Sequence, residues 1–440
     1  MSDETRPAKV QKAQPVRGMQ DFLGDQAARF EHVTGTFRDV SRRFGFRRVE
    51  VPVVEFTSVF ARTLGETTDV VSKEMYTFED RNGESLTLRP EFTAGICRAY
   101  ISEGWQQFAP LKLVTHGPLF RYERPQKGRY RQFHQLDAEV IGSAEPAADV
   151  ELIAFADLLL KELGVGGVTL QLNTLGDAES REAWRTALVR HFERYVGDLS
   201  EDSQRRLRDN PLRILDSKDP KDRPIVEVAP GVGDYLTREA GLFFEEVIRK
   251  LRLSGVHFAL APGLVRGFDY YRHTAFEFVS NNLGAQSTVI GGGRYDGLIE
   301  SMGGSATPAV GWAGGIERLM MLASAPEMDG PELAIIPASD QATDFAEKAA
   351  YMLREAGISV EIAFSGSEKR RFEKAKKAGV KRLLNVEILS PDLIGLRLRN
   401  LVPNDEADPI RGKLKTALST QFAVNDDPIT RVISITDKPK

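Results

Sequence analysis

Residues 120–142 read FRYERPQKGRYRQFHQLDAEVIG, a basic loop followed by a strand-like run in which polar and apolar side chains alternate. Together with KLVTHGPLF (112–120), this stretch predicts two antiparallel strands joined by a long loop. Side chains alternate between the two faces of a strand, so Gln135, Asp137 and Glu139 share one face and the apolar residues beside them share the other. Polar groups inside a sheet need partners, and this face is therefore expected to floor a polar site.

The loop between the two strands is strongly basic. From Arg121 to Arg131 it carries five basic residues and one acid. A run of charges often forms only a solvated hairpin tip. Here it is flanked by strands with a polar inner face, and arginine forks bind phosphate groups well. The loop is therefore a candidate for handling phosphates.

The segment RPEFTAG (89–95) combines a helix start with polar side chains. Pro90 follows a strand and suits the first turn of a helix. Glu91 and Thr93 would then lie at the helix start, where they accept hydrogen bonds from free N–H groups. Spacing alone leaves two interpretations open, a plain helix cap or a ligand site.

A second turn occurs in LVRGFDYYRHTAFEF (264–278), where Gly267 permits a sharp change of direction. The plain interpretation is a turn with aromatic side chains packed beneath it. The alternative is a site built from the residues that cluster beside the glycine, namely Arg266, Asp269, Tyr270 and Tyr271.

Glycines recur in GGGRYDGL (291–298) and GWAGGIERL (311–319). They allow a ligand or a second backbone to approach closely, but they match neither the GxxxxGK[ST] nor the GxGxxG phosphate-binding pattern. Arg318 lies in a helix that starts after these glycines, where a surface ion pair is its ordinary role. An antiparallel sheet with a polar face, arginines and glycines fits an enzyme that activates a small molecule with a nucleoside triphosphate.

The rest of the chain has segments of different character. Apolar residues at steps of three and four predict a helix over 26–44, and RRVEVPVV (47–54) is a strand-like run interrupted by Pro52. Residues 177–255 are charged and helical in pattern, like an insertion. A boundary rich in Pro, Gly and acids falls at 322–332, and the strand-helix alternation after it predicts a small parallel α/β domain.

The composition excludes several classes of protein. With 440 residues, 41% hydrophobic and 28% charged, the chain should form two or three ordinary globular domains. A net charge of -4 does not suit a general nucleic-acid binder, so any nucleic acid must meet a local basic patch. The single cysteine excludes an internal disulfide and a Cys-rich zinc site. No signal or membrane-spanning run is present, which predicts a cytoplasmic protein with no membrane association.

In chain order, these segments resemble the three motifs of class II aminoacyl-tRNA synthetases. RGMQDFLG (17–24), NPLRILDSK (210–218) and LVRGFDYYRHTAFE narrow the resemblance to the histidyl-tRNA synthetase family, up to about residue 325. The resemblance implies an α+β catalytic domain with a six-stranded antiparallel sheet, a helical insertion, and a small C-terminal α/β domain of the anticodon-binding kind. The expected parts are a mobile tail (1–15), the catalytic domain (16–325, insertion about 177–255) and the C-terminal domain (331–440).

The resemblance also implies an activity: histidine reacts with ATP and Mg²⁺ to form histidyl-adenylate, and the histidyl group passes to tRNA(His) on a homodimeric enzyme. No residue is assigned to a resident metal. The implied catalytic residues are Arg266 and Arg121. The implied histidine-binding residues are Glu91, Thr93, Arg121, Gln135, Glu139, Arg266, Tyr270 and Tyr271, with Glu139 and Tyr271 on the imidazole. The implied ATP-binding residues are Arg121 at the α-phosphate, Glu123, Arg129 at the far phosphates and Arg318 at the adenine.

Four features depart from the family pattern, the first being Gly24, which stands where proline is expected. Phe92 stands where glycine is expected, which predicts a tighter or rearranged amino-acid pocket. Asp137 adds a charge beside Glu139. In the C-terminal part, residues 366–382 carry eight Lys or Arg against two Glu, which suits an RNA backbone, but NVEILSPDLIGLRLRNL (385–401) does not follow the usual continuation, so no anticodon contact is assigned.

The main alternative is the synthetase-like regulatory subunit of ATP phosphoribosyltransferase, a binding module of histidine biosynthesis without catalytic activity. Such proteins usually lose the histidine-specific motif, whereas this chain keeps RGFDYY (266–271) and the three motif arginines. A synthetase for another amino acid is disfavoured by Glu139 together with Tyr271. A purely structural RNA-binding protein would have no use for a polar strand face.

Overall fold

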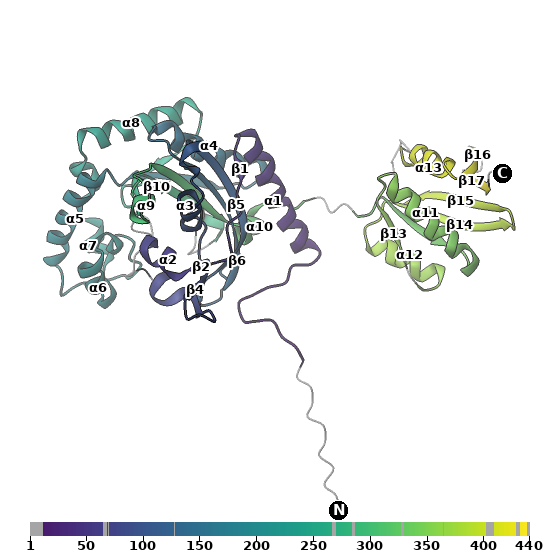
Figure 1. Cartoon of the computed structure of the whole chain (residues 1–440), viewed down its shortest axis with the longest axis horizontal. Coiled ribbons are helices and arrows are strands. Elements are labelled where there is room, and N and C mark those ends of the chain that lie inside the picture. Colours follow the sequence, from purple (N-terminus) through teal and green to yellow (C-terminus); the bar gives the residue numbers. More distant parts are fainter. Residues whose placement is uncertain are drawn as a thin grey trace, which may run out of the picture. The chain divides into compact units, whose positions relative to one another are not determined.

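The computed structural model describes residues 12–64, 68, 70–126, 128–265, 270–283, 287–326, 330–363, 365–401, 409–427 and 432–437. The chain forms two compact units, Met1–Pro326 and Glu327–Lys440 (Figure 1). The division falls within the Pro-, Gly- and acid-rich stretch of the sequence. In the part of the chain that the structure describes, no helix is both long enough and apolar enough to cross a membrane.

The first unit is built on an eight-stranded sheet of order β1-β5-β6-β11-β10-β9-β7-β8. The antiparallel pair predicted around the basic loop is confirmed as β5 and β6, which pair along their whole length. The strands are β1 (Arg47–Arg48), β5 (Leu111–Phe120), β6 (Gln132–Ile141), β7 (Val168–Thr174), β8 (Ala259–Leu260), β9 (Arg272–Ser280), β10 (Thr288–Arg294) and β11 (Ala309–Gly315).

The prediction of a six-stranded antiparallel sheet was wrong in the number of strands and in the type of pairing at the two edges. The six strands from β5 to β7 in the sheet order are each antiparallel to their neighbours. Two short strands extend this core at its edges, where β1 pairs with β5 and β8 pairs with β7 in parallel. Each contributes only two residues, too few to leave a clear two-residue period in the sequence.

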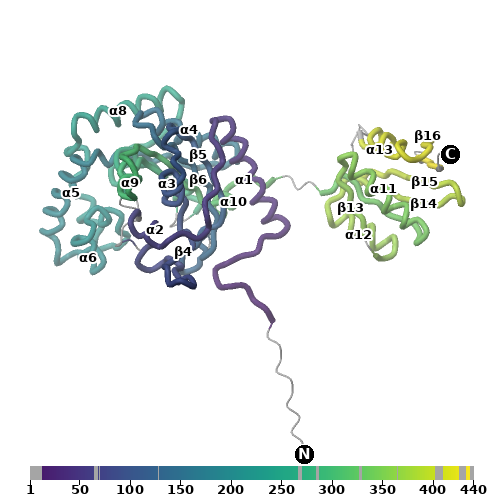
Figure 2. Tube along the Cα trace, in the orientation of Figure 1, coloured from purple at the N-terminus to yellow at the C-terminus, as the bar shows by residue number. Residues whose placement is uncertain are grey.

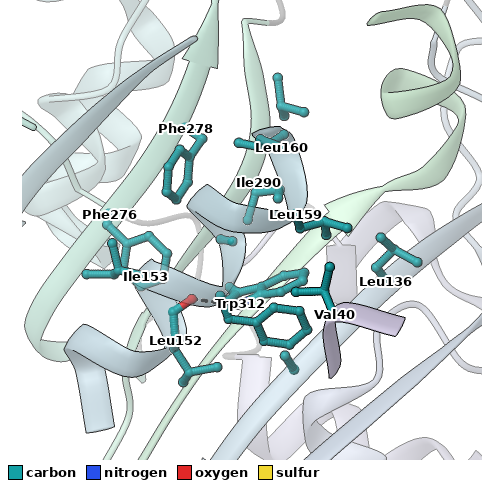
Figure 3. Packing of buried hydrophobic residues seen from close by; sticks show 14 of the residues in the cluster. Val40, Leu136, Leu152, Ile153, Leu159, Leu160, Phe276, Phe278, Ile290 and Trp312 are labelled. Carbon is teal, nitrogen blue, oxygen red and sulfur yellow. Dashed lines mark hydrogen bonds between the residues drawn. The ribbon is translucent and has the colours of Figure 1, made fainter. Parts of the chain in front are cut away.

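One face of the main sheet is covered by a layer of helices. They are α1 (Asp25–Arg43), α4 (Pro146–Glu162), α8 (Arg238–Leu253) and α10 (Ile316–Leu322). Figure 2 shows α1, from the start of the chain, beside α10, from the end of the unit. The core beneath these helices is shown in Figure 3, where Trp312 of β11 lies among Val40, Leu136 and Leu159, and its indole N–H donates to the Leu152 carbonyl at 3.1 Å.

The helix predicted over 26–44 is confirmed as α1, and the strand-like run at 47–54 is interrupted around Pro52, as its sequence indicated. The chain there forms β1 of the main sheet and then β2 (Val54–Phe56), which belongs to a separate three-stranded sheet. Pro52 lies between them because it cannot donate to a strand ladder. The small sheet is antiparallel, of order β2-β4-β3, with β3 (Tyr76–Glu79) and β4 (Ser85–Leu88).

The other face of the main sheet carries α3 (Thr93–Ser102), the neighbouring helices α2 (Thr57–Leu64) and α9 (Leu298–Ser301), and a π-helical turn at Val70–Glu74. The expected insertion is helical: α5 (Ala178–Glu193), α6 (Glu201–Asp209) and α7 (Arg223–Glu227) pack together with short 3₁₀ turns. The insertion was predicted to end near residue 255 and would then include α8. However, α8 contacts α4 and β9 and therefore belongs to the layer that covers the sheet.

A buried ion pair joins this helical layer to the sheet. Arg294 of β10 and Asp149 of α4 both have fully buried side chains, and Arg294 Nε lies 3.1 Å from Asp149 Oδ2. Arg294 also donates to the Ser143 and Glu145 carbonyls and to Asp296. The guanidinium is therefore satisfied on several sides, as a buried charge must be.

The second unit holds a six-stranded sheet of order β13-β12-β14-β15-β17-β16. The expectation of a parallel sheet is only half right, because β13, β12 and β14 are parallel whereas β15, β17 and β16 are antiparallel to their neighbours. Its elements are β12 (Leu333–Pro337), α11 (Thr343–Glu355), β13 (Val360–Ile362), α12 (Glu368–Lys377), β14 (Arg382–Ser390), β15 (Leu393–Asn400), α13 (Pro409–Ser419), β16 (Phe422–Asp427) and β17 (Val432–Asp437).

Candidate active site

A cavity of about 580 Å³ lies on the face of the main sheet opposite the helical layer. The alternation predicted for β6 is confirmed, since Leu136, Ala138 and Val140 enter the core while the polar residues between them line the cavity. Of the predicted site residues, Arg266 lies outside the described residues. All the others line this one cavity: Glu91, Thr93, Arg121, Glu123, Arg129, Gln135, Glu139, Tyr270, Tyr271 and Arg318.

Glu139 is held rigidly in the cavity wall. Its side chain is 1% exposed, and both carboxyl oxygens accept hydrogen bonds, Oε1 from Thr93 Oγ1 at 2.7 Å and Oε2 from the Tyr295 hydroxyl at 2.5 Å. Gly311 lies directly opposite on β11, and a Cβ there would overlap Glu139 Oε2. The glycine that the sequence placed in a ligand-approach motif is therefore required by the carboxyl group itself.

Among the described residues, five buried carboxyl groups line the cavity, and three of them show the same kind of pKa shift: Glu91, Asp137 and Glu139. Burial raises the pKa of each, to about 8 for Glu139, and the nearby Glu139 and Glu91 charges raise the pKa of Asp137 further. The backbone N–H of Ala94 and the charge of Arg121 partly offset this effect on the pKa of Glu91. Such a cluster suits a ligand that brings N–H donors and positive charge.

The raised pKa of Glu139 predicts a pH dependence of stability. Between about 4.5, its ordinary pKa, and about 8, the folded chain binds a proton that the unfolded chain has lost, so the free energy of unfolding falls as pH rises through this range. At about 1.4 kcal/mol per unit of pKa difference, the loss amounts to a few kcal/mol.

Urea unfolding of the wild type and of Glu139→Gln at both ends of this range measures the effect. The variant should show a flatter dependence on pH, whereas Glu300→Gln, which changes an exposed carboxylate on α9, should retain the wild-type slope. Equal slopes in the wild type and in Glu139→Gln would contradict the assignment.

Three arginines bring positive charge to the same cavity: Arg121, Arg129 and Arg318. Arg121 Nε donates to the Pro90 carbonyl at 2.9 Å, and its guanidinium lies 5.2 Å from the centre of the Phe133 ring. Burial lowers the pKa of all three, and for Arg318 repulsion by the other two adds to this effect. Glu123 pairs with Arg129. A cluster of desolvated guanidinium groups is a strong site for a polyanion.

The start of α3 supplies the rest of the wall. The helix begins at Thr93, so Pro90 precedes its first turn instead of occupying it. Glu91 Oε1 accepts from the Ala94 N–H at 2.9 Å, so the cap is real even though the same residue lines the cavity. Phe92 does not line the cavity; its ring lies 4.5 Å from the Arg89 guanidinium, within the core. Phe92 itself therefore does not narrow the pocket, and the rearranged pocket that was the other expectation stays a prediction.

Aromatic side chains form a further part of the wall. The Tyr270 ring centre lies 4.5 Å from that of Tyr271 and 5.6 Å from that of Tyr295. Tyr295, in GGGRYDGL, was not singled out as a site residue, although it fixes Glu139. The signal available in the sequence was that this residue directly follows the strand that contains the three glycines.

Two further groups of cavity residues were missed by sequence reasoning. Glu277 accepts from Thr288 Oγ1 at 2.7 Å, and both lie on the cavity floor. Asp216 and Lys218 reach the cavity from the NPLRILDSK segment, and with Arg129 they also line an adjoining cavity of about 460 Å³. The insertion thus contributes to the site, which its charged, surface-like pattern did not indicate.

Comparisons with known proteins agree with this geometry. The family model described as histidyl-tRNA synthetase matches residues 18–179 and 236–319. A histidine–tRNA ligase from Novosphingobium aromaticivorans is 57% identical over 93% of this chain and 98% of its own length. The apo histidyl-tRNA synthetase of S. aureus superposes with a TM-score of 0.73 at 30% identity, covering 89% of this chain and 98% of that chain.

A second solved structure is also similar to this chain. It is described as an ATP phosphoribosyltransferase regulatory subunit/histidyl-tRNA synthetase from Bacillus halodurans, with a TM-score of 0.63, 21% identity, and coverage of 86% of this chain and 99% of that one. At this identity the likeness shows the fold alone.

A sheet with buried carboxyl groups and arginines around one cavity, together with these relatives, defines an aminoacyl-tRNA synthetase. The family match spans more than half of the chain and the ligase relative covers nearly all of it. The chain belongs to the histidyl-tRNA synthetase family.

Proposed function

We propose that the cavity binds L-histidine and ATP, forms histidyl-adenylate, and passes the histidyl group to the 3′ end of tRNA(His). The observation that carries the proposal is the meeting of two opposed groups in one cavity, the buried carboxyls Glu91 and Glu139 and the arginines Arg121, Arg129 and Arg318. The first group suits the ammonium and imidazole of histidine, and the second suits a triphosphate.

In the first half-reaction the histidine carboxylate attacks the α-phosphorus of ATP. A C–O–P bond forms, the bond to the bridging oxygen breaks, and pyrophosphate leaves. Negative charge develops on the phosphoryl oxygens, so Arg121, fixed against Pro90, would stabilise the transition state without having to move. The nucleophile is already ionised, so no general base is needed.

The cavity would select histidine because the polar groups that line it are buried. Glu91, Thr93 and Gln135 are proposed to hold the α-amino group, and Glu139 with Tyr271 the imidazole, while Tyr270 packs beside Tyr271. An amino acid without ring nitrogens would leave buried polar groups unpaired, which costs roughly 1–3 kcal/mol for each group. Discrimination of this kind can be large without any editing step.

Mg²⁺ would enter with the phosphates of ATP and neutralise charge on their oxygens. Carboxylate oxygens are its preferred protein ligands, and Glu277 and Glu317 offer them in the cavity wall. Among residues with described side chains, no group of three or more His, Cys, Asp or Glu is arranged to hold a metal ion alone.

In the second half-reaction the terminal tRNA hydroxyl attacks the adenylate carbonyl and AMP leaves. We propose that the second unit binds the tRNA through α12, whose Lys369, Arg370, Lys374, Lys376 and Lys377 are exposed, whereas Arg371 and Arg382 are buried. This function would place the protein in the cytoplasm.

We also propose a homodimer, as the family resemblance implies for the motif-one region. Val53, Phe56 and Phe78 lie on or beside the small sheet there and are exposed large apolar side chains. Exposed apolar groups of this size commonly mark a contact surface.

The experiment that tests the function is ATP–pyrophosphate exchange by the full chain, with Mg²⁺ present and each amino acid offered separately. Exchange with histidine alone is expected. Folded protein that binds histidine but exchanges with no amino acid would favour the regulatory subunit instead. Exchange with a different amino acid would refute the assignment of the pocket.

A further inference from the structure

The motif RGMQDFLG (17–24), which leads into α1, has no part in the reaction so far. All of its residues are described, and none of them lines the cavity. The backbone turns at Gly18, where φ is 85° and the Met19 N–H donates to the Val16 carbonyl at 3.0 Å. This turn contacts the basic loop, and Phe22 contacts β6, next to the start of α10. The segment thus meets both elements that carry the proposed ATP-binding arginines.

The first contact holds the end of the basic loop. The Gly18 carbonyl accepts from the Arg131 N–H at 2.8 Å and from the Gln132 N–H at 3.3 Å. The Arg131 carbonyl accepts from the Arg121 N–H at 2.9 Å, and Arg131 Nε donates to the Glu123 carbonyl at 3.1 Å. A Cβ on Gly18 would lie only 2.9 Å from Arg131 Cγ, so this close approach requires glycine. Both ends of the loop are therefore tied to the segment through Arg131.

The second contact holds the start of α10. The centre of the His134 ring lies 5.8 Å from that of Phe22 and 5.0 Å from that of Phe30 on α1. The His134 N–H donates to both carboxyl oxygens of Glu317, at 2.9 and 3.0 Å, and His134 Nδ1 lies 2.9 Å from Glu317 Oε1. Glu317 is buried in the first turn of α10, directly before Arg318, and both line the cavity. Phe22 therefore braces the histidine that fixes the helix turn carrying Arg318.

We infer that residues 17–22 are a positioning element for ATP, which holds the loop of Arg121 and Arg129 and the helix turn of Arg318 in one arrangement. The inference rests on the proposed function, because it takes ATP as the polyanion that these arginines bind. Arg318 is repelled by the other two guanidinium groups, so the group must be held together before the ligand arrives. A site that is already assembled spends less of its binding energy on ordering.

The histidine half of the cavity is held by other contacts. Glu139 accepts from Thr93 and Tyr295, and Glu91 accepts from the Ala94 N–H. Loss of the contacts made by residues 17–22 should therefore weaken the use of ATP and leave histidine binding intact. A purely structural role for the segment would affect both ligands alike or neither.

The test titrates ATP and histidine separately into the full chain by calorimetry, and measures the KM of each in ATP–pyrophosphate exchange. Gly18→Ala and Phe22→Ala should lower kcat/KM for ATP about 10- to 100-fold through a higher KM, the scale of a misplacement of about 1 Å, while histidine affinity stays within about twofold of the wild type. Phe22→Tyr keeps the ring and should restore most of the ATP affinity lost in Phe22→Ala.

Gly24→Ala and Leu23→Ala are the matched controls. Gly24 also has a positive φ, of 61°, but a Cβ added there meets nothing within 4 Å, so this variant carries the backbone strain without the contact. Leu23 lies beside Phe22 in the chain and is 88% exposed. Both controls should retain the ATP affinity of the wild type.

An equal loss for histidine and ATP in Gly18→Ala and Phe22→Ala, or no loss in either variant, would overturn the inference. If the wild type binds ATP but shows no exchange with any amino acid, the proposed function fails, and the ATP titrations still decide the role of residues 17–22. A wild-type chain that binds no ATP would overturn both.

Discussion

Arg121→Ala is expected to reduce histidine-dependent ATP–pyrophosphate exchange by about 10²- to 10³-fold, the usual effect of removing one preorganised donor to a developing negative charge. The Arg121 side chain lies against Pro90 and Phe133 at the cavity wall. Burial lowers the pKa of Arg121, which means that keeping this charge out of water costs the folded chain free energy. A phosphate group would compensate for that cost.

Arg121→Lys should recover only part of the activity, because a lysine keeps the charge and loses the planar fork. Arg124→Ala is the control within the same loop, since Arg124 is exposed and does not line the cavity. Single-turnover formation of histidyl-adenylate measures all three variants. An Arg121→Ala enzyme with wild-type turnover would remove Arg121 from the mechanism.

Asp149→Ala is expected to lower the free energy of unfolding by about 3 kcal/mol, because the fully buried Arg294 loses its buried counter-charge and keeps only the partly exposed Asp296. The loss of stability should appear as a lower urea concentration at the midpoint of unfolding of the first unit. The double variant Asp149→Leu with Arg294→Met should regain much of the loss, since a buried pair replaced by apolar groups is often neutral.

The control for this pair is Glu246→Gln, which breaks the exposed pairs of Glu246 with Arg249 and Lys250 on α8 and should barely change stability. If Asp149→Ala were as mild as Glu246→Gln, the ion pair would not be holding α4 on the sheet.

Local patterns predicted much of the site. The two-residue period of β6 placed Gln135 and Glu139 on the cavity side, and the glycines of β10 and β11 indicated close approach. These predictions succeeded because a strand's alternation is set by backbone geometry and survives whatever packs beside it. The family resemblance supplied the arginines, and the described ones do line one cavity.

Other features depend on contacts between distant segments and left no local signal. Asp216 reaches the cavity from the insertion, and Tyr295 meets Glu139 across 156 residues of chain. Phe92 packs in the core beside Arg89, a contact that its position in a motif did not indicate. The antiparallel pair β14–β15 did leave a local signal, since only Pro391 and Asp392 separate the two strands, as in a hairpin, and the prediction of a parallel sheet overlooked it.

The strand order of the main sheet has a consequence for protein synthesis. β11 is the last of the eight strands to be made, yet it lies between β6 and β10. Until residues 309–315 have left the ribosome, a nascent chain can form only two separate half-sheets, each with an unpaired edge exposed to other chains. We therefore expect ribosomes stalled just before this segment to carry chains that aggregate or recruit chaperones, and a delay in translation there to be more harmful than one at any earlier strand.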